Sequence, residues 1–271
     1  MIVKPNCKIN LGLNIVRKRI DGYHDIETVF YPVGICDSIE INPSDDGMFH
    51  FSSSGLKIPG DPATNLCVQA YNLMKEHFNV PPVTIHLQKN IPMGSGLGGG
   101  SSDGAYTLKA LNELIKPRLT SEHLKAFASR LGSDCTFFVD NKPAFAKGRG
   151  ELLSTVSVPL PGLYLLIVIP QVHVNTIEAY SLIQPARPVT SIKETINLPV
   201  SQWKGRMIND FEDVVIRKYP LIGQIKELLY EKGAVYASMS GSGSAVYGLF
   251  NETPAVDGLF PGCFVWMADS R

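Results

Sequence analysis

The chain has 271 residues, of which 44% are hydrophobic and 18% are charged, the composition of a globular protein with a substantial core in one or two domains. Its 25 basic residues balance its 25 acidic residues. This balance gives no reason to expect nucleic acid or an anionic membrane as a partner.

The first half of the chain is predicted to mix strands and helices. Strands are assigned where apolar and polar residues alternate, and helices where apolar residues recur every three or four positions. In chain order, the predicted elements are a strand at 7–16, extended segments at 26–41 that break near Gly34, a helix at 64–78, a strand at 83–89, and helices at about 102–115 and about 120–131. Thr64 or Asn65 is the expected N-cap of the first helix, and Thr120 is that of the last.

The second half continues this mixed pattern. Its predicted elements are a linker at 151–162, a buried strand at 163–170, helical structure over 207–230 interrupted at Pro220, and strands at 234–239 and 245–250 around a glycine-rich turn. The continuous apolar run supports the first strand, and the glycine-rich turn between the last two segments supports the other two. The second half is therefore also of mixed class.

Cysteine usage and the N-terminus predict a soluble cytoplasmic protein. The five cysteines are scattered singly, which fits reduced thiols in a cytosolic chain. The basic N-terminal segment is not followed by a long apolar run, so it does not resemble a secretory signal. The most apolar stretch, 160–170, is too short to span a bilayer.

A glycine-rich segment is the strongest chemical feature of the sequence. It lies between a predicted strand and a predicted helix and consists of Pro92, Met93, Gly94, Ser95, Gly96, Leu97, Gly98, Gly99, Gly100, Ser101 and Ser102. Glycine permits positive φ and close approach of a ligand to the backbone. A helix N-terminus offers free N–H groups and a positive dipole end. The segment is therefore predicted to bind phosphate, whereas a flexible surface loop would not need this placement.

Two well-known nucleotide loops fit this segment poorly. Gly94, Gly96 and Gly99 satisfy G-x-G-x-x-G, but a dinucleotide-binding unit needs a second strand ending in an acidic residue about 20 residues further on. A Walker A loop is excluded because no Gly-Lys-Ser/Thr follows. What remains is a glycine-serine phosphate loop without its own lysine, so the cation must come from elsewhere in the chain or from Mg²⁺.

Residues 92–102 resemble the second motif of the GHMP kinases, with the spacing of the members that phosphorylate diphosphocytidyl-methylerythritol. Further blocks resemble this family in order along nearly the whole chain: Lys8 to Leu13, Asp21-Gly22-Tyr23-His24, Leu131 to Phe138, Ala144 to Glu151, Asn209 to Glu212, and Ser240 to Ser244. The Asp-Gly-Tyr-His block is specific to the diphosphocytidyl-methylerythritol kinases. The chain departs from the family pattern at Cys7, Asp103-Gly104, Thr136 and Ser242.

The resemblance implies a role for each matched residue. Asp134 would be the catalytic base, and Lys8 would orient the alcohol and offset charge on the transferred group. Without the family, Asp134 would more readily be interpreted as a turn aspartate satisfied by backbone N–H groups. The implied substrate-binding residues are Asn10, Tyr23, His24, Tyr180, Gly241 and Gly243. Tyr23 and Tyr180 would stack on a cytosine whose edge His24 would bind. Asp103 would either favour the dipole of the following helix or hold Mg²⁺.

The fold and reaction implied by the resemblance are those of a two-domain α+β GHMP kinase. Residues 1–155 would form a domain like the second domain of ribosomal protein S5, and residues 156–271 a ferredoxin-like domain, with the site between them. The reaction would transfer the γ-phosphate of ATP, with Mg²⁺, to the 2-hydroxyl of 4-diphosphocytidyl-2-C-methyl-D-erythritol, in the methylerythritol phosphate route of isoprenoid biosynthesis.

Several alternatives and secondary expectations accompany this interpretation. Another GHMP small-alcohol kinase remains possible, as does a non-catalytic nucleotide-binding protein on the same fold, although retention of Lys8 and Asp134 argues against the latter. The other histidines form no pair with ligand spacing, so no structural metal is expected: residues 50, 77, 86, 123 and 173. The enzyme is expected to act as a monomer or a homodimer.

Overall fold

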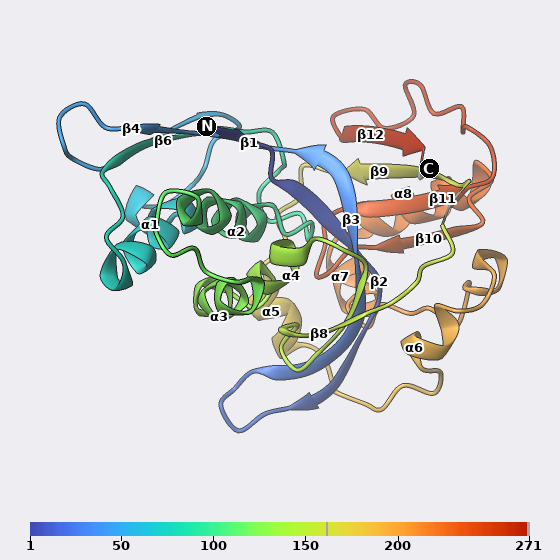
Figure 1. Cartoon of the computed structure of the whole chain (residues 1–271). Coiled ribbons are helices and arrows are strands. Elements are labelled where there is room, and N and C mark those ends of the chain that lie inside the picture. The colour runs from blue at the N-terminus through green and yellow to red at the C-terminus, as the bar shows by residue number, and fades with distance from the viewer. Residues whose placement is uncertain (161, 270–271) are drawn as a thin grey trace. The chain divides into compact units, whose positions relative to one another are not determined.

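The computed structural model describes residues 1–160 and 162–269, and the chain forms two compact units (Figure 1). Unit 1 comprises residues 1–8, 32–93 and 98–142, and unit 2 comprises residues 9–31, 94–97 and 143–271. Residue 161, which belongs to the predicted linker, lies outside the described residues.

Unit 1 contains one sheet of four strands, in the order β1-β4-β6-β5. Their bounds are Ile2–Val3 (β1), Ser38–Pro43 (β4), His50–Gly55 (β5) and Val83–Lys89 (β6). β6 runs antiparallel to β4 and parallel to β5. The alternation over 83–89 predicts β6 correctly, and every second residue of the strand, from Val83 to Lys89, is buried.

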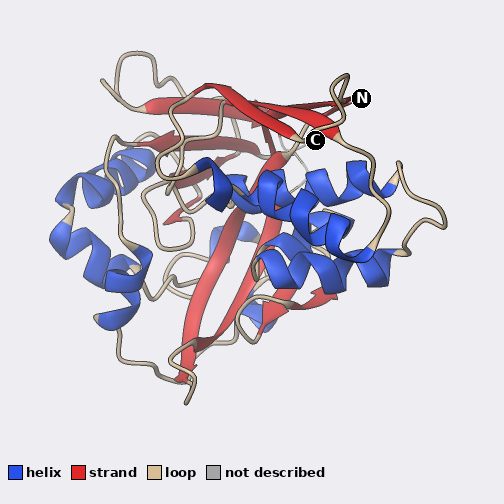
Figure 2. Ribbon diagram, turned by 90° about the vertical axis from the view of Figure 1, so that its left-hand side faces the viewer, coloured by secondary structure: helices blue, strands red, loops and turns tan. Residues whose placement is uncertain are grey.

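Helices cover one side of this sheet, as both views show (Figures 1 and 2). They are η1 (Pro62–Thr64), α1 (Leu66–His77), α2 (Gly99–Asn112), α3 (Ser121–Leu131) and α4 (Cys135–Asp140). Asn65 caps α1 and Thr120 caps α3, as predicted. α2 begins three residues before its predicted start because Gly99 packs closely on Ile91, which offsets the poor helix propensity of the glycines.

A four-stranded sheet built on the long hairpin of β2 and β3 has the order β2-β3-β7-β8, and most of it lies in unit 2. Its strands are Asn6–Lys18 (β2), His24–Cys36 (β3), Ala144–Lys147 (β7) and Leu152–Thr155 (β8). β8 lies inside the segment predicted as a linker, so that prediction was wrong for 152–155. The predicted break near Gly34 also shifts. β3 ends at Cys36. At the next residue, Asp37, the side-chain carboxylate accepts hydrogen bonds from the backbone N–H groups of Asn90 and Ile91, and this contact fixes the end of the strand.

The second sheet of unit 2 has the order β10-β11-β9-β12. Its strands are Tyr164–Ile169 (β9), Tyr236–Met239 (β10), Val246–Phe250 (β11) and Phe264–Asp269 (β12). The helices are α5 (Thr176–Ser181), α6 (Ile192–Thr195), η2 (Val200–Gln202), α7 (Glu212–Lys218) and α8 (Pro220–Glu231). Pro220 begins α8, so the predicted interruption is confirmed. None of the helices in the described ranges is long and apolar enough to cross a membrane.

Candidate active site

The glycine-rich segment forms the turn between β6 and α2. Gly94, Gly96 and Gly98 have φ values of 65°, 78° and 70°, which side chains rarely allow. Gly98 is the N-cap of α2, and within the described chain no side chain caps this helix. A Cβ on Gly100 would meet no described atom within 4 Å. The start of α2 thus lacks a side-chain cap and is open at Gly100, an arrangement that suits phosphate oxygens.

The third glycine motif, Ser240–Ser244, packs against this loop. Within unit 2, Ser240 Oγ donates to the carbonyl of Gly96 at 3.0 Å, and the N–H of Ala245 donates to the carbonyl of Ser95 at 3.0 Å. A Cβ on Gly96 would lie 2.1 Å from the Ser240 carbonyl oxygen. Glycine at position 96 is therefore required by close backbone approach as well as by its positive φ.

Asn209, which lies three residues before α7, binds the third glycine motif. Its Nδ2 donates to the carbonyls of Met239 and Gly241, at 2.8 and 2.9 Å. Gly241 and Gly243 occupy the turn between β10 and β11 with φ values of 58° and 89°. Asn209 thus holds the turn in shape, while substrate contact by Gly241 and Gly243 stays a prediction.

Lys8 and Asp134 form an ion pair in unit 1. Lys8 Nζ lies 3.4 Å from Asp134 Oδ2, with 4% of the lysine side chain and 33% of the aspartate side chain exposed. Asp134 occupies the N-cap position of α4, yet its carboxylate accepts no capping hydrogen bond from the described residues. A Cβ on Gly98 would stand 3.1 Å from Lys8 Cε, so the lysine passes the start of α2. A partly solvent-exposed carboxylate and a buried ammonium thus lie beside the phosphate loop.

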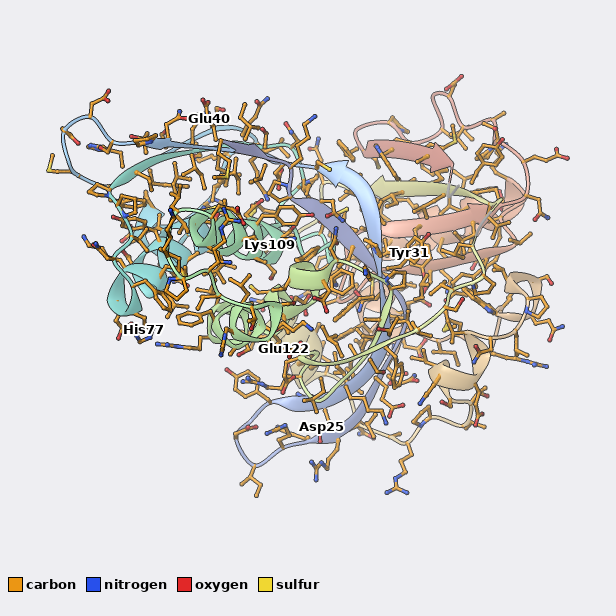
Figure 3. The ribbon with its side chains drawn as sticks, in the orientation of Figure 1. Asp25, Tyr31, Glu40, His77, Lys109 and Glu122 are labelled. Atoms are coloured by element: carbon orange, nitrogen blue, oxygen red, sulfur yellow. The ribbon has the colours of Figure 1, made fainter. Side chains whose placement is uncertain are left out.

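The hairpin that joins β2 to β3 carries the predicted base-binding residues. Asp25 accepts hydrogen bonds from Arg17 at 2.5 Å and Arg19 at 3.2 Å at the end of this hairpin (Figure 3). These bonds lower the pKa of Asp25 despite some desolvation. Burial, and then Lys18, lower the pKa of His24 below its ordinary value of 6.5. His24 is therefore mainly neutral at pH 7, with one ring nitrogen able to donate and the other to accept.

Tyr23 and Tyr180, which were predicted to stack together on a cytosine, each contact a different neighbour in the structure. The rings of His24 and Tyr180 are stacked, with centroids 4.9 Å apart and an angle of 18°. Tyr180 also places its ring at 84° to that of Phe211, 4.8 Å away. Tyr23 is 55% exposed, and the Arg149 guanidinium lies 4.8 Å from its ring centroid. The structure thus brings His24 to Tyr180 and places Tyr23 with Arg149.

Asn10 lies in the interior of β2. Its Nδ2 donates to Thr28 Oγ1 at 3.0 Å, its N–H donates to Ser240 Oγ at 3.1 Å, and Tyr247 donates its hydroxyl hydrogen to the Asn10 carbonyl at 3.0 Å. These bonds fasten β2 to β3, to the third glycine motif and to β11. Asn10 thus has a structural role in unit 2, and its predicted contact with substrate stays a prediction.

Comparison with known proteins identifies the family of this chain. Residues 65–148 match the model of the GHMP kinases N terminal domain, and residues 197–259 match that of GHMP kinases C terminal. The chain is 53% identical to the 4-diphosphocytidyl-2-C-methyl-D-erythritol kinase of Bacteroides fragilis, with 100% of each chain covered. The chain belongs to the 4-diphosphocytidyl-2-C-methyl-D-erythritol kinase family. The kinase of the same name from Porphyromonas gingivalis is 42% identical, with 99% of each chain covered.

Solved structures agree with this family assignment. A crystal structure of 4-(cytidine 5'-diphospho)-2C-methyl-D-erythritol kinase covers 98% of each chain with a TM-score of 0.79 and 30% identity. A crystal structure of mevalonate kinase reaches a TM-score of 0.74 at 14% identity, which indicates a shared fold alone. The two-domain α+β fold predicted for the GHMP kinases is therefore confirmed.

A pocket of 210 Å³ in unit 1 adjoins the phosphate loop of this kinase-family chain, and the sequence did not predict it. Its wall includes residues from 58 to 66, together with Met93, Gly100 and Asp103. Residues 58–66 lack a periodic pattern, so nothing in their spacing indicates that they form a wall. Only Asn65, the predicted cap of α1, marked this region in advance.

Proposed function

We propose that this chain transfers the γ-phosphate of ATP to the 2-hydroxyl of 4-diphosphocytidyl-2-C-methyl-D-erythritol, a step of isoprenoid biosynthesis. The observation that carries the proposal is the Lys8–Asp134 ion pair beside the start of α2. Membership of the 4-diphosphocytidyl-2-C-methyl-D-erythritol kinase family supports the choice of acceptor.

The chemistry assigned to this ion pair is activation of the acceptor alcohol. Asp134 accepts the proton as the hydroxyl oxygen attacks phosphorus, and its partial exposure lets an alcohol approach within hydrogen-bond reach. Lys8 orients the alcohol and stabilises negative charge on the transferred phosphoryl group.

The nucleotide donor is assigned to the loop and its neighbouring pocket. The phosphates bind at the bare N-terminus of α2, and the base enters the 210 Å³ pocket, whose wall contains Met93 and Gly100. Mg²⁺ enters as part of the substrate MgATP, bound to phosphate oxygens, where it neutralises developing charge. Among the described residues there is no group of three or more His, Cys, Asp or Glu side chains placed to hold a metal ion.

The cytidine end of the acceptor is assigned to the hairpin of β2 and β3 and to α5. Tyr180 offers an aromatic face, and the exposed ring of Tyr23 offers a second. The neutral ring of His24 can donate one hydrogen bond and accept another at the edge of a base.

We further infer a cytoplasmic enzyme that acts as a monomer or a homodimer.

The experiment that tests the function measures ADP release with several alcohols. The candidates are 4-diphosphocytidyl-2-C-methyl-D-erythritol, mevalonate and homoserine, with the product mass determined in each case. We expect turnover and a monophosphorylated product only with the first. Preferential turnover of another alcohol would move the chain to a different GHMP activity, and nucleotide binding without turnover would make it a binding protein.

A further inference from the structure

A buried cluster of three ionisable side chains lies within unit 1, at the base of the phosphate loop. Lys89 Nζ stands 2.5 Å from Asp37 Oδ2 and 2.6 Å from Asp103 Oδ2. The side chains of Lys89, Asp37 and Asp103 are 1%, 0% and 4% exposed. They come from the end of β6, the link between β3 and β4, and the second turn of α2. The sequence assigned no role to Lys89 or Asp37.

The cluster fastens both ends of the loop. On the strand side, Asp37 Oδ1 accepts the N–H groups of Asn90 and Ile91, at 2.6 and 2.8 Å. These two residues lead directly from β6 into the loop. On the helix side, a Cβ on Gly99 would lie 3.2 Å from Lys89 Nζ and 2.9 Å from Ile91 Cγ2. The ammonium of Lys89 is therefore packed against the first residue of α2.

Stability alone does not account for these charges. A cation near the N-terminus of α2 opposes the helix dipole unless nearby carboxylates offset it. Burying these ionisable groups also costs desolvation energy, and apolar residues of similar volume often serve stability equally well. What the groups add is geometry, since the hydrogen bonds of the ammonium and of the two carboxyl groups form only in particular directions.

We propose that Lys89 is a positioning residue that sets the separation between the two ends of the phosphate loop. Through Asp37 it holds the end of β6, and through Asp103 it holds α2, so that the N–H groups at the start of α2 are placed for ATP before it binds. The inference rests on the proposed function of the loop as the ATP phosphate site. It also assigns Asp103 a task other than binding Mg²⁺ or favouring the helix dipole.

The charge of the cluster adds a dependence on pH. Burial raises the pKa of Asp103 to about 8, against the opposing influence of Lys89. The thiols that face the cluster are those of Cys67 on α1, near Asp103, and of Cys7 on β2 and Cys36 at the end of β3, near Asp37. Burial raises the pKa of Cys67 and Cys7 to about 12 and raises that of Cys36 above its ordinary value of 9.0, so these thiols stay neutral near pH 8. Below about pH 8 the cluster is therefore neutral, and above it carries one negative charge close to the phosphate loop.

The deciding experiment compares Michaelis constants in the full-length enzyme. The double variant Lys89→Met/Asp103→Asn removes the ammonium and one carboxylate, and it leaves Asp37 bound to the N–H groups of Asn90 and Ile91. We expect KM for ATP to rise roughly tenfold to a hundredfold, because N–H groups that are displaced from the phosphates lose hydrogen bonds to charged oxygens, and this rise corresponds to about 1.4–2.7 kcal/mol of binding free energy. KM for the alcohol should change less than about twofold, since the acceptor uses other residues.

Val83→Ala provides the matched control, because it removes buried volume from the other end of β6. It should lower the melting temperature and leave KM for ATP unchanged. If it raises this KM as much as the double variant does, or if the double variant has a normal KM for ATP, Lys89 is merely structural. If Gly98→Val also leaves ATP binding intact, the assignment of the loop itself fails instead.

A second variant, Asp103→Asn, keeps the Lys89–Asp37 pair and an oxygen that can accept from Lys89, but its side chain cannot titrate. We expect wild-type KM for ATP to rise above about pH 8, while that of Asp103→Asn stays flat across the same range. Parallel profiles for the two proteins would overturn the charge argument. A purely structural role for the cluster would not produce a difference in pH profile.

Discussion

Replacing Asp134 by asparagine separates the catalytic role of this residue from a structural one. Asparagine keeps the size and a hydrogen-bond acceptor but cannot take a proton at neutral pH. In the structure the Asp134 side chain is 33% exposed and accepts no capping hydrogen bond within the described part of α4. Helix α4 should therefore lose little when the carboxylate is neutralised.

The magnitudes expected from the two roles differ clearly. Loss of a general base lowers kcat by roughly 10²–10⁴-fold, which corresponds to about 2.7–5.5 kcal/mol of transition-state stabilisation. Loss of an N-capping aspartate would instead cost about 1 kcal/mol of folding stability, or about 2–4 °C in melting temperature for a chain of this size class. For Asp134→Asn we expect the first effect and not the second.

The assay combines steady-state kinetics, calorimetric titration with a non-hydrolysable ATP analogue, and thermal unfolding. Asp140→Asn is the matched control on α4, because Asp140 pairs with Lys125 at 2.7 Å and lies at the other end of this helix. It should retain wild-type kcat. The base assignment is refuted if Asp134→Asn turns over within a few-fold of wild type, or if its loss of activity follows a loss of fold.

Three further predictions concern the loop and the base-binding residues. Gly98→Val should abolish ATP-analogue binding with normal circular dichroism, because φ is +70° there and a Cβ would stand 3.1 Å from Lys8 Cε; unchanged affinity would contradict this. Tyr180→Ala should raise KM for the alcohol by roughly tenfold to a hundredfold, equivalent to about 1.4–3 kcal/mol of stacking, and leave KM for ATP unchanged; the reverse pattern would exchange the two nucleotide sites. Burial lowers the pKa of His24 in the folded chain, so the unfolded chain binds a proton at this histidine more readily. The stabilising contribution of neutral His24 is therefore complete above pH 6.5 and is lost as the pH falls through the lower pKa of the folded state. Urea unfolding at about pH 7.5 and about pH 5.5 should show a smaller loss of stability for His24→Phe than for wild type, and equal losses would contradict the assignment.

The local structure of this chain could be predicted from its sequence because it depends on near neighbours. Alternation over 83–89 predicts β6, and the caps Asn65 and Thr120 mark the starts of α1 and α3. The glycine-rich segment predicts a turn between a strand and a helix because its backbone requirements are local. The family, too, follows from short motifs in order along the chain.

The boundaries that moved did so because of distant contacts. The break predicted near Gly34 occurs at Asp37, since that carboxylate binds N–H groups 53 and 54 positions away. α2 starts early because Gly99 fits against Ile91. The partners of Asp37 lie outside any local window of sequence, and the contact between Gly99 and Ile91, although only eight positions apart, depends on how the loop folds back, where propensity alone says that glycine disfavours a helix.

The arrangement of the site was decided by tertiary structure. The close approach of Gly96 to Ser240, 144 positions away, and the stacking of His24 on Tyr180 are packing events that no spacing encodes. Lys89 was partly foreseeable, because alternation in β6 places it on the buried face, where an ammonium needs an anion. Which carboxylates would supply it depends on the fold, since Asp37 and Asp103 reach Lys89 only when the β3–β4 link and α2 pack beside the end of β6.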